Sequence, residues 1–288
     1  MILIIGASGK IGNHIWEYCV NHNIECLGTY STHEMEGLYH YDLSDDLQAF
    51  LEERNAIEKA ETAIICSAIT DIDRCKLNRS ESDNINVLCT EKVIRECIRL
   101  EIKPVFISSE AVFDGKKGMY KENDSVNPIT VYGQQKLEVE TFIRKSCKSY
   151  LVVRISRAIS SKWNNQGILK DFNDKVSKGQ PIICIKNQRF SLTDADDIAE
   201  SVIRAINKNM TGIYHISNNS NISRAELAKL YLSQVLKTES MIIEKELNEF
   251  LFVDSRHILG GLDGSLLAEK IDKQYKSVAD ILEEINEK

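Results

Sequence analysis

The sequence predicts an α/β protein with a doubly wound parallel sheet and a smaller lobe near the C-terminus. Three observations predict this fold. A strand-length apolar run at residues 1–5 enters a glycine-rich loop, apolar runs then alternate with amphipathic stretches, and this rhythm changes after residue 155. Apolar strands that alternate with helices indicate a parallel sheet covered on both faces. Ligands of such sheets bind beyond the carboxyl ends of the strands.

The first half of the chain supplies five predicted strands and four predicted helices. The strands are continuous apolar runs, at Ile2–Ile5, Ile24–Leu27, Thr62–Cys66, Val105–Ser108 and Leu151–Ile155. The helices carry apolar residues at helical spacing, at Ile11–His22, Asp46–Asn55, Ile85–Leu100 and Val131–Lys145.

Three glycines follow the first strand at the spacing G-x-x-G-x-x-G and open a helix. In this context Gly6 permits a tight turn, Gly9 lets the backbone approach a pyrophosphate, and Gly12 allows close packing of helix on strand. The helix N-terminus adds free N–H groups and the positive end of its dipole. The loop predicts the dinucleotide site of a Rossmann domain. The expected contacts come from Gly6, Ser8, Gly9, Lys10, Ile11 and Gly12.

The second half of the chain is predicted to hold shorter elements. They are helices near Gly167–Lys178 and at Asp196–Asn207, and strands at Ile182–Ile185 and Gly212–Ile216. Ser223 and Glu226 have the spacing of a capping box, which starts another helix. We predict a dinucleotide-binding domain of residues 1–155 plus about 193–217. Residues of about 156–192 plus 218–288 form the predicted substrate-binding lobe, with a cleft between the two.

The composition argues against several classes of protein. A net charge of −7 over 288 residues disfavours nucleic acid and anionic membrane surfaces as partners. The eight cysteines form no C-x-x-C pair and the six histidines are scattered, so we expect no metal site and a reducing compartment. No apolar run approaches the roughly 20 residues that span a bilayer. We therefore expect a soluble, cytoplasmic protein.

The end of the second strand selects between the two nicotinamide dinucleotides. About 20 residues after the glycine loop, an NAD-selective site places a carboxylate against the ribose hydroxyls. This chain has residues 28–31, Gly-Thr-Tyr-Ser, at that point. Without a carboxylate, a 2′-phosphate meets no repulsion there, and Thr29 and Ser31 are able to donate to it, with Lys10 and His33 nearby. The sequence favours NADPH and leaves NADH open.

Tyr132 and Lys136 lie four residues apart on a predicted helix and so share one face. A phenol has a pKa near 10, and a neighbouring ammonium lowers that pKa toward the working range. An isolated Y-x-x-x-K is more often a core tyrosine and a solvated lysine. Here the hydroxyls of Ser108 and Ser109 stand where a strand ends at the ligand edge of the sheet, where they can bind a substrate carbonyl. The pattern therefore indicates an acid–base pair.

These motifs together resemble the extended short-chain dehydrogenase/reductase superfamily, and within it the dTDP-4-dehydrorhamnose reductase family. The likeness spans nearly the whole chain. It includes the glycine loop, Asp42-Leu43 after the third strand, residues 68–75, Asn86-Val87, residues 108–115, Tyr132 with Lys136, Arg154, and residues 187–199.

The resemblance implies NADPH-dependent reduction of the 4-keto group of a nucleotide-linked deoxysugar. It implies that Ser109 polarises the keto oxygen, that Tyr132 donates the proton, and that Lys136 tunes Tyr132 and holds the nicotinamide ribose. By the same likeness Asn86 has a structural or proton-relay role. The remaining cofactor contacts that it implies are Asp42 and Leu43 beside adenine, and Cys66, Ser67 and Ala68 along the cofactor's path.

The chain departs from the family pattern where the substrate should lie. Glu110-Ala111 replaces the family's Asp-Tyr, Leu192 replaces a proline, and residues 156–166 do not match the expected substrate loop. The particular sugar and nucleotide are therefore left open. Glu110, beside Ser109, remains a predicted substrate contact.

Two further predictions concern the second lobe. Arg189 is a candidate for binding the nucleotide diphosphate, because guanidinium and phosphate pair in a bidentate manner; a solvated surface arginine is the alternative. Trp163 and Phe172 have the right chemistry to stack on a substrate base, but core packing is the interpretation that we favour for both.

Two other functions fit the same motifs. An epimerase or dehydratase keeps the fold, although a dehydratase needs an acid–base pair beside Ser109 and only Glu110 offers a carboxylate there. A non-catalytic regulatory subunit, similar to the β subunit of methionine adenosyltransferase, would bind the dinucleotide and a partner protein. Intact Ser109, Tyr132 and Lys136 favour the enzyme, for which a homodimer is left open.

Overall fold

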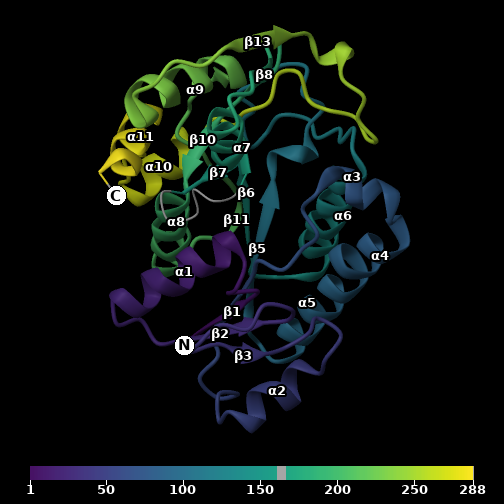
Figure 1. Ribbon diagram of the computed structural model, residues 1–288. Coiled ribbons are helices and arrows are strands. Elements are labelled where there is room, and N and C mark those ends of the chain that lie inside the picture. The colour runs from purple at the N-terminus through teal and green to yellow at the C-terminus, as the bar shows by residue number, and fades with distance from the viewer. Residues whose placement is uncertain (161–166, 288) are drawn as a thin grey trace.

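The computed structural model, which describes residues 1–160 and 167–287, confirms the doubly wound α/β architecture (Figure 1). Its seven-stranded sheet has the order β11–β6–β5–β4–β1–β2–β3, and all neighbouring strands are parallel. The strands are β1 (Ile2–Ile5), β2 (Cys26–Tyr30), β3 (Tyr39–His40), β4 (Thr62–Ile65), β5 (Lys103–Ser109), β6 (Leu151–Ile155) and β11 (Gly212–Ile216). The strand order reverses between β1 and β4, which makes their carboxyl ends the expected ligand crevice.

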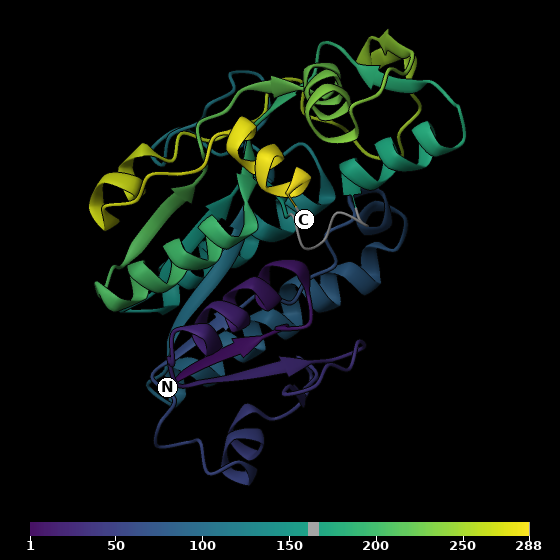
Figure 2. The ribbon, with the colours of Figure 1, turned by 60° about the vertical axis from the view of Figure 1, so that its left-hand side comes forward.

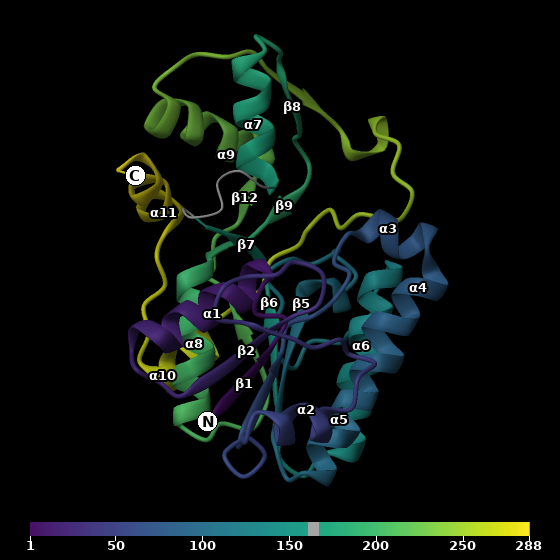
Figure 3. The same cartoon turned by 60° about the horizontal axis from the view of Figure 1, so that its bottom comes forward.

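Helices cover both faces of this sheet (Figure 3). One face is covered by α1 (Lys10–Asn21), α8 (Ala195–Asn207) and α10 (Ser265–Ile271). The opposite side carries α2 (Leu47–Glu53), α3 (Ile72–Leu77), α4 (Arg79–Asp83), α5 (Thr90–Arg99) and α6 (Val131–Ser146). Helices α1 and α8 lie side by side, which brings the glycine loop close to the chain that returns from the second lobe (Figure 2).

The second lobe lies beyond the carboxyl ends of the strands (Figure 3). Its helices are α7 (Gly167–Ser177), α9 (Arg224–Tyr231) and α11 (Val278–Asn286). Its strands pair as β7 (Arg157–Ile159) with β10 (Leu192–Asp194), β8 (Ile182–Ile185) with β13 (Ile242–Lys245), and β9 (Arg189–Phe190) with β12 (Ile222–Ser223). The predicted capping box is confirmed, because Ser223 and Glu226 make both of its hydrogen bonds. Phe172 is buried in the core of this lobe, whereas Trp163 lies outside the described residues.

Two element predictions were wrong in detail. The second strand runs over Cys26–Tyr30 and not Ile24–Leu27, because Ile24 closes the end of α1 through a hydrogen bond from its N–H to the Cys19 carbonyl. The predicted helix Ile85–Leu100 is an α-helix only from Thr90, and a π-helical turn precedes it over Asn84–Cys89. The short helices α3 and α4 were not predicted, since one or two turns carry too little periodicity.

The proposed division into two domains stays a prediction, and one helix crosses it. Leu267 and Ile271 of α10 belong to the same core cluster as Ile15 and Ile198, although α10 falls in the predicted substrate lobe. The apolar face of α10 is covered by β11 and α8. The C-terminal part of the chain therefore returns to the Rossmann sheet before α11 joins the second lobe.

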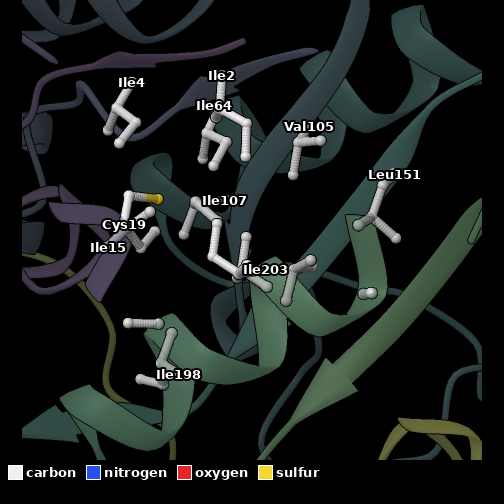
Figure 4. Packing of buried hydrophobic residues seen from close by; sticks show 14 of the residues in the cluster. Ile2, Ile4, Ile15, Cys19, Ile64, Val105, Ile107, Leu151, Ile198 and Ile203 are labelled. Carbon is white, nitrogen blue, oxygen red and sulfur yellow. The ribbon is translucent and has the colours of Figure 1, made fainter. Parts of the chain in front are cut away.

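The core lies on both faces of the sheet. On the face of α1 and α8, branched side chains from five strands meet those of the two helices, as Figure 4 shows for Ile4, Ile64, Ile107, Ile15 and Ile198. Alternate residues of the same strands point to the opposite face, which α2, α5 and α6 cover. This close packing fixes where each strand ends, and hence where the site residues emerge.

A buried ion pair lies between α6 and the sheet. Arg154 at the end of β6 makes two hydrogen bonds to the Glu140 carboxylate on α6, at 3.0 and 2.7 Å. The same carboxylate accepts a hydrogen bond from Ser108 at 2.6 Å. Arg154 also contacts His215 on β11, and burial followed by the charge of Arg154 lowers the pKa of His215 to about 3. This network links β5, α6, β6 and β11.

Removal of Arg154 should destabilise the fold strongly. Arg154→Met leaves the buried Glu140 charge without its cationic partner, and we expect a loss of about 3–5 kcal/mol in the free energy of unfolding. The matched control is Arg79→Met, which breaks an exposed pair with Asp83 and should cost less than about 0.5 kcal/mol. Urea unfolding of the two variants makes the comparison. A loss below about 1 kcal/mol for Arg154→Met would contradict the prediction.

Candidate functional site

The glycine loop joins β1 to α1 at the carboxyl edge of the sheet. The Gly6 N–H donates to the Thr29 hydroxyl, and the Ala7 N–H donates to the Thr29 carbonyl, so the end of β2 holds the loop. Within the described chain no side chain caps the N-terminus of α1. The first-turn N–H groups of α1 are therefore open to an anion, which fits a bound pyrophosphate.

The three glycines of this loop have different reasons to be glycine. Gly6 has a φ of +85°, and a Cβ there would lie 2.4 Å from the Ser67 hydroxyl. A Cβ on Gly12 would lie 2.2 Å from the Gly6 carbonyl oxygen, so this glycine permits the packing of α1 on the loop. A Cβ on Gly9 meets only the Gly6 carbonyl, at 3.4 Å. Gly9 is exposed, and the fold itself does not require a glycine at this position.

The residues predicted to surround the cofactor's ribose divide into two groups. Thr29 is fully buried and its hydroxyl holds Gly6, so it supports the loop from beneath. Ser31 is exposed and donates to the Asp42 carboxylate at 3.0 Å. The other oxygen of Asp42 accepts from the N–H and O–H of Ser44, and these bonds lower the pKa of Asp42. The pairing of β2 with β3 thus brings a carboxylate beside Ser31, which the local sequence did not reveal. Leu43 is buried in the core.

The end of β4 forms the opposite side of the crevice. Cys66, Ser67 and Ala68 follow β4 and are half-buried, with Ser67 against Gly6. Asn86 fixes this segment, because its Oδ1 accepts from the Ile69 N–H at 2.8 Å and its Nδ2 donates to the Ile69 carbonyl at 2.9 Å. The Nδ2 group also donates to Gln135 on α6, at 2.8 Å. Asn86 therefore joins the β4 loop to the helix of Tyr132, which favours its structural role.

Strand β5 and helix α6 bring the predicted catalytic residues together. Ser109 is the last residue of β5, and its hydroxyl is close enough to the Tyr132 phenol to act on the pKa of Tyr132 as a hydrogen-bonding neighbour. Lys136 lies one turn further along α6 and donates to the Ile107 carbonyl of β5 at 3.0 Å. Its ammonium lies 4.6 Å from the centre of the Phe106 ring and 5.7 Å from that of Tyr132. One edge of the sheet therefore carries Ser109, Tyr132 and Lys136.

Burial is the main influence on the pKa values of Lys136 and Tyr132. It lowers the pKa of Lys136 to about 8, against smaller opposing effects of Cys66 and Glu140. It raises the pKa of Tyr132, and the hydrogen bond with Ser109 offsets only part of that rise. The net pKa of Tyr132 in the protein alone is therefore raised and not lowered, because desolvation of the phenolate dominates. The predicted effect of Lys136 on the phenolate stays a prediction. A raised pKa keeps the phenol protonated, which is the state that a proton donor needs.

Glu110 follows Ser109 directly and lies at the boundary of the two lobes. Its Oε2 accepts a hydrogen bond of 2.7 Å from the Gly261 N–H, and burial raises its pKa against the effects of this bond and of Arg157. The carboxylate thus has a partner from the last third of the chain.

A cleft of about 520 Å³ lies between the glycine loop and the second lobe. Three cations line it, Lys10 from α1, Arg157 from β7, and Arg256 from the segment after β13, whereas Asp71 is the only acidic residue among its described lining. Burial lowers the pKa of Lys10. The guanidinium of Arg157 lies 4.5 Å from the centre of the Phe190 ring, and among the described residues it forms no ion pair. This cleft suits an anionic ligand.

Arg189, the predicted diphosphate contact, binds residues of the second lobe outside this cleft. Its guanidinium donates to the side chain and the carbonyl of Asn221 and pairs with Glu226 at 3.1 Å, at the start of α9. It does not line the cleft. Its predicted role toward a diphosphate stays a prediction, and Arg157 and Arg256 are the arginines that the fold places in the cleft. Little in the sequence pointed to these two arginines, because Arg157 lies in a polar segment without a family match and Arg256 in a segment without periodicity.

The fold and the site together define a Rossmann protein with the residue set of a short-chain dehydrogenase/reductase. The chain belongs to the family described as "RmlD substrate binding domain", whose model matches residues 1–250. It is 24% identical over 233 residues to dTDP-4-dehydrorhamnose reductase of Mycobacterium tuberculosis, covering 77% of this chain and 71% of that protein. It is 25% identical over 237 residues to methionine adenosyltransferase 2 subunit beta of Danio rerio, covering 78% and 71%.

A solved structure has the same fold over almost the whole chain. The structure of dTDP-4-dehydrorhamnose reductase from Bacillus anthracis, in complex with NADP, superimposes with a TM-score of 0.86 at 22% identity, covering 99% of this chain and 97% of that one. In the part of the chain that the structure describes, every helix is too short or too polar to cross a bilayer. In the same part, no three His, Cys, Asp or Glu side chains gather as metal ligands do.

Substitution of Gly9 should separate cofactor binding from folding. Gly9→Val places a side chain over the open N-terminus of α1 with room in the fold, so we expect a folded protein whose affinity for the dinucleotide falls at least about a hundredfold, which is roughly 2.7 kcal/mol. Gly12→Val, by contrast, should disrupt the loop itself. Calorimetric titration with NADPH and thermal unfolding measure both effects. Unchanged affinity in a folded Gly9→Val protein would remove this loop from the cofactor site.

Proposed function

We propose that this chain reduces the 4-keto group of a nucleotide-linked deoxysugar with NADPH, and that Tyr132 donates the proton. The single observation that supports the proposal is the convergence of Ser109, Tyr132 and Lys136 at the carboxyl end of β5, on the sheet edge where the glycine loop follows β1. The family supports the substrate class, since the relative from Mycobacterium tuberculosis is named dTDP-4-dehydrorhamnose reductase.

Ser109, Tyr132 and Lys136 have different roles in the proposed reaction. Reduction of a ketone leaves an alkoxide, so a proton must reach the oxygen as it gains charge. In this proposal Ser109 holds the keto oxygen and Tyr132 protonates it. Lys136 is an ammonium below a pH of about 8 and stabilises the phenolate that remains. Activity should therefore decline as the pH rises through about 8, because the folded-state pKa of Lys136 lies below its ordinary value.

The nicotinamide cofactor supplies the hydride when bound. The open N-terminus of α1 and the exposed Gly9 fit its pyrophosphate. In this proposal Lys136 holds the ribose, as the family resemblance implies. We propose NADPH, because residues 28–31 carry no carboxylate and the Bacillus anthracis relative was solved with NADP. The carboxylate of Asp42, which receives hydrogen bonds from Ser31 and Ser44, leaves NADH as a second cofactor for the same pocket.

We infer that Arg157 binds the diphosphate of the nucleotide sugar. It lines the cleft between the lobes together with Arg256 and Lys10, and its guanidinium stacks on Phe190. Although Arg157 is exposed at the mouth of the cleft, partial desolvation of its guanidinium and then the charges of Arg224 and Arg256 lower its pKa. A dianion placed among these cations would relieve their repulsion. Arg189 has already satisfied its guanidinium with Asn221 and Glu226 and is the weaker candidate.

A non-catalytic binding subunit is the second candidate. The likeness to methionine adenosyltransferase 2 subunit beta of Danio rerio favours it. Such a subunit would bind the dinucleotide without consuming it. A dehydratase is disfavoured by the contact of Glu110 with Gly261, because the carboxylate that directly follows Ser109 already accepts a hydrogen bond from a backbone N–H.

Tyr132→Phe tests the mechanism. The ring and its packing remain while the proton donor is lost, so turnover should fall by about 10²–10⁴ with little change in cofactor affinity. Single-turnover oxidation of NADPH with a panel of 4-keto nucleotide sugars is the measurement, and the unaltered protein is its reference. Full activity in the variant would refute Tyr132 as donor. No activity of the unaltered protein across the panel, with NADPH bound, would favour the binding subunit.

Substitution by methionine tests whether Arg157 or Arg189 binds the diphosphate. Arg157→Met should raise the Michaelis constant for the keto sugar about tenfold or more and change turnover less than about threefold, because a diphosphate contact remote from C4 binds substrate and transition state alike. Arg189→Met is the control, with an expected change below about twofold in both constants. A raised Michaelis constant in Arg189→Met with a normal one in Arg157→Met would instead assign the diphosphate contact to Arg189.

A further inference from the structure

A segment from the last third of the chain wraps around the candidate catalytic residues. Residues 254–261, named here the 254–261 strap, connect the second lobe to the Rossmann domain between β13 and α10. In Figure 3 the yellow-green chain after β13 descends to α3 before it turns toward the sheet. The strap lies between the segment that follows Ser109 and the start of the helix that carries Tyr132.

One end of the strap binds the residue before Tyr132. The Asp254 carboxylate accepts a hydrogen bond of 2.8 Å from the N–H of Val131, the first residue of α6. Asp254 is itself held, because its N–H donates to Asp73 on α3 at 3.1 Å. Arg256 pairs with the other oxygen of Asp73 at 2.8 Å. The start of α6, α3 and the strap are thereby joined through Asp73 and Asp254.

The other end of the strap binds the residues after Ser109. The Gly261 N–H donates to Glu110, and the Leu259 N–H donates to the Gly115 carbonyl at 2.7 Å. The His257 ring lies 3.0 Å from the Phe113 carbonyl through its Nε2, and burial lowers the pKa of this histidine, so the neutral ring donates that bond. Gly115 has a φ of +67°, and a Cβ there would collide with His257 at 2.5 Å.

The bond to Val131 does not belong to the helix itself. The first N–H groups of a helix have no partner within it, and the Thr130 hydroxyl caps the N–H of Gly133, not that of Val131. Asp254 therefore completes the N-terminus of α6 at the residue next to Tyr132. A misplacement of about 1 Å at a reacting group can cost about a hundredfold in rate. The direction of the Tyr132 phenol depends on how the first turn of α6 is held.

We propose that Asp254 is a positioning residue, which orients Tyr132 toward Ser109 through its hydrogen bond with Val131. The inference rests on the proposed reductase function for its kinetic consequences. Asp254 does not touch the substrate and acts through the backbone of α6. Asp254 is held by Asp73, which also binds Arg256 of the cleft. The chain that leaves the second lobe therefore helps to position the proton donor.

Two substitutions remove the same hydrogen bond from opposite sides. Asp254→Ala removes the acceptor. Val131→Pro removes the donor, and proline is well tolerated at the first position of a helix, with Thr130 already in the extended conformation that precedes proline. Each variant should lower turnover about ten- to a hundredfold, while the Michaelis constant and the NADPH affinity change less than about threefold. The double variant should be no slower than the worse single one.

Asp254→Asn and Asp280→Ala complete the experiment. Asparagine keeps an acceptor oxygen and should restore turnover to within about threefold of the unaltered protein. Asp280 is a carboxylate in the capping box of α11, remote from the site, and Asp280→Ala should leave turnover unchanged. Normal turnover in Asp254→Ala, or losses that multiply in the double variant, would overturn the proposal.

A readout without turnover separates this inference from the function on which it rests. Deuterium exchange of the peptide covering residues 128–137 should be faster in Asp254→Ala than in the unaltered protein or in Asp280→Ala, because the Val131 amide is released. If the unaltered protein reduces no keto sugar, the proposed function fails and faster exchange still supports the anchoring. Unchanged exchange overturns the anchoring, whatever the activity. Val131→Pro carries the kinetic test alone if Asp254→Ala does not fold.

Discussion

The attachment of helix α6 to strand β5 is the interaction on which the candidate site depends. Lys136 donates to the Ile107 carbonyl, and Glu140, one turn further, binds Ser108 and Arg154. These polar groups are buried, and a buried polar group is tolerated only when its hydrogen bonds are made. A shift of α6 along β5 by one residue would leave two charges without partners. The register of the helix is therefore fixed, and Tyr132 emerges beside Ser109.

Desolvation gives this site its chemical character. The same burial that lowers the pKa of Lys136 to about 8 raises that of Tyr132, so the site holds a neutral phenol beside a cation whose charge is easily lost. The chain carries a net charge of −7, but Lys10, Arg157 and Arg256 gather in the cleft between the lobes. The field that a ligand meets is set by these nearby cations, because the dispersed surface charges are screened by salt.

Much of the fold could be predicted because its signals are local. The apolar runs of β1, β4, β5, β6 and β11 and the periodicity of α6 and α8 depend only on residues close in sequence, and the structure has these elements within one or two residues of the prediction. The second strand was misplaced because Ile24 is apolar for another reason, the closure of α1. The π-helical turn before α5 was missed because Asn86 makes its bonds with Ile69 and Gln135, which are distant in sequence.

The sequence by itself determined the glycine loop, the pairing of Tyr132 with Lys136 on one helical face, and the capping box of α9, since each is a relation between residues a few positions apart. Only the tertiary structure decided which arginine lines the cleft, that Asp42 stands beside Ser31, and that Asp254 binds Val131 across 123 residues. The physical reason is that the partner of a charged group is whatever folding brings within about 3 Å of it. That partner leaves no periodic pattern in the chain.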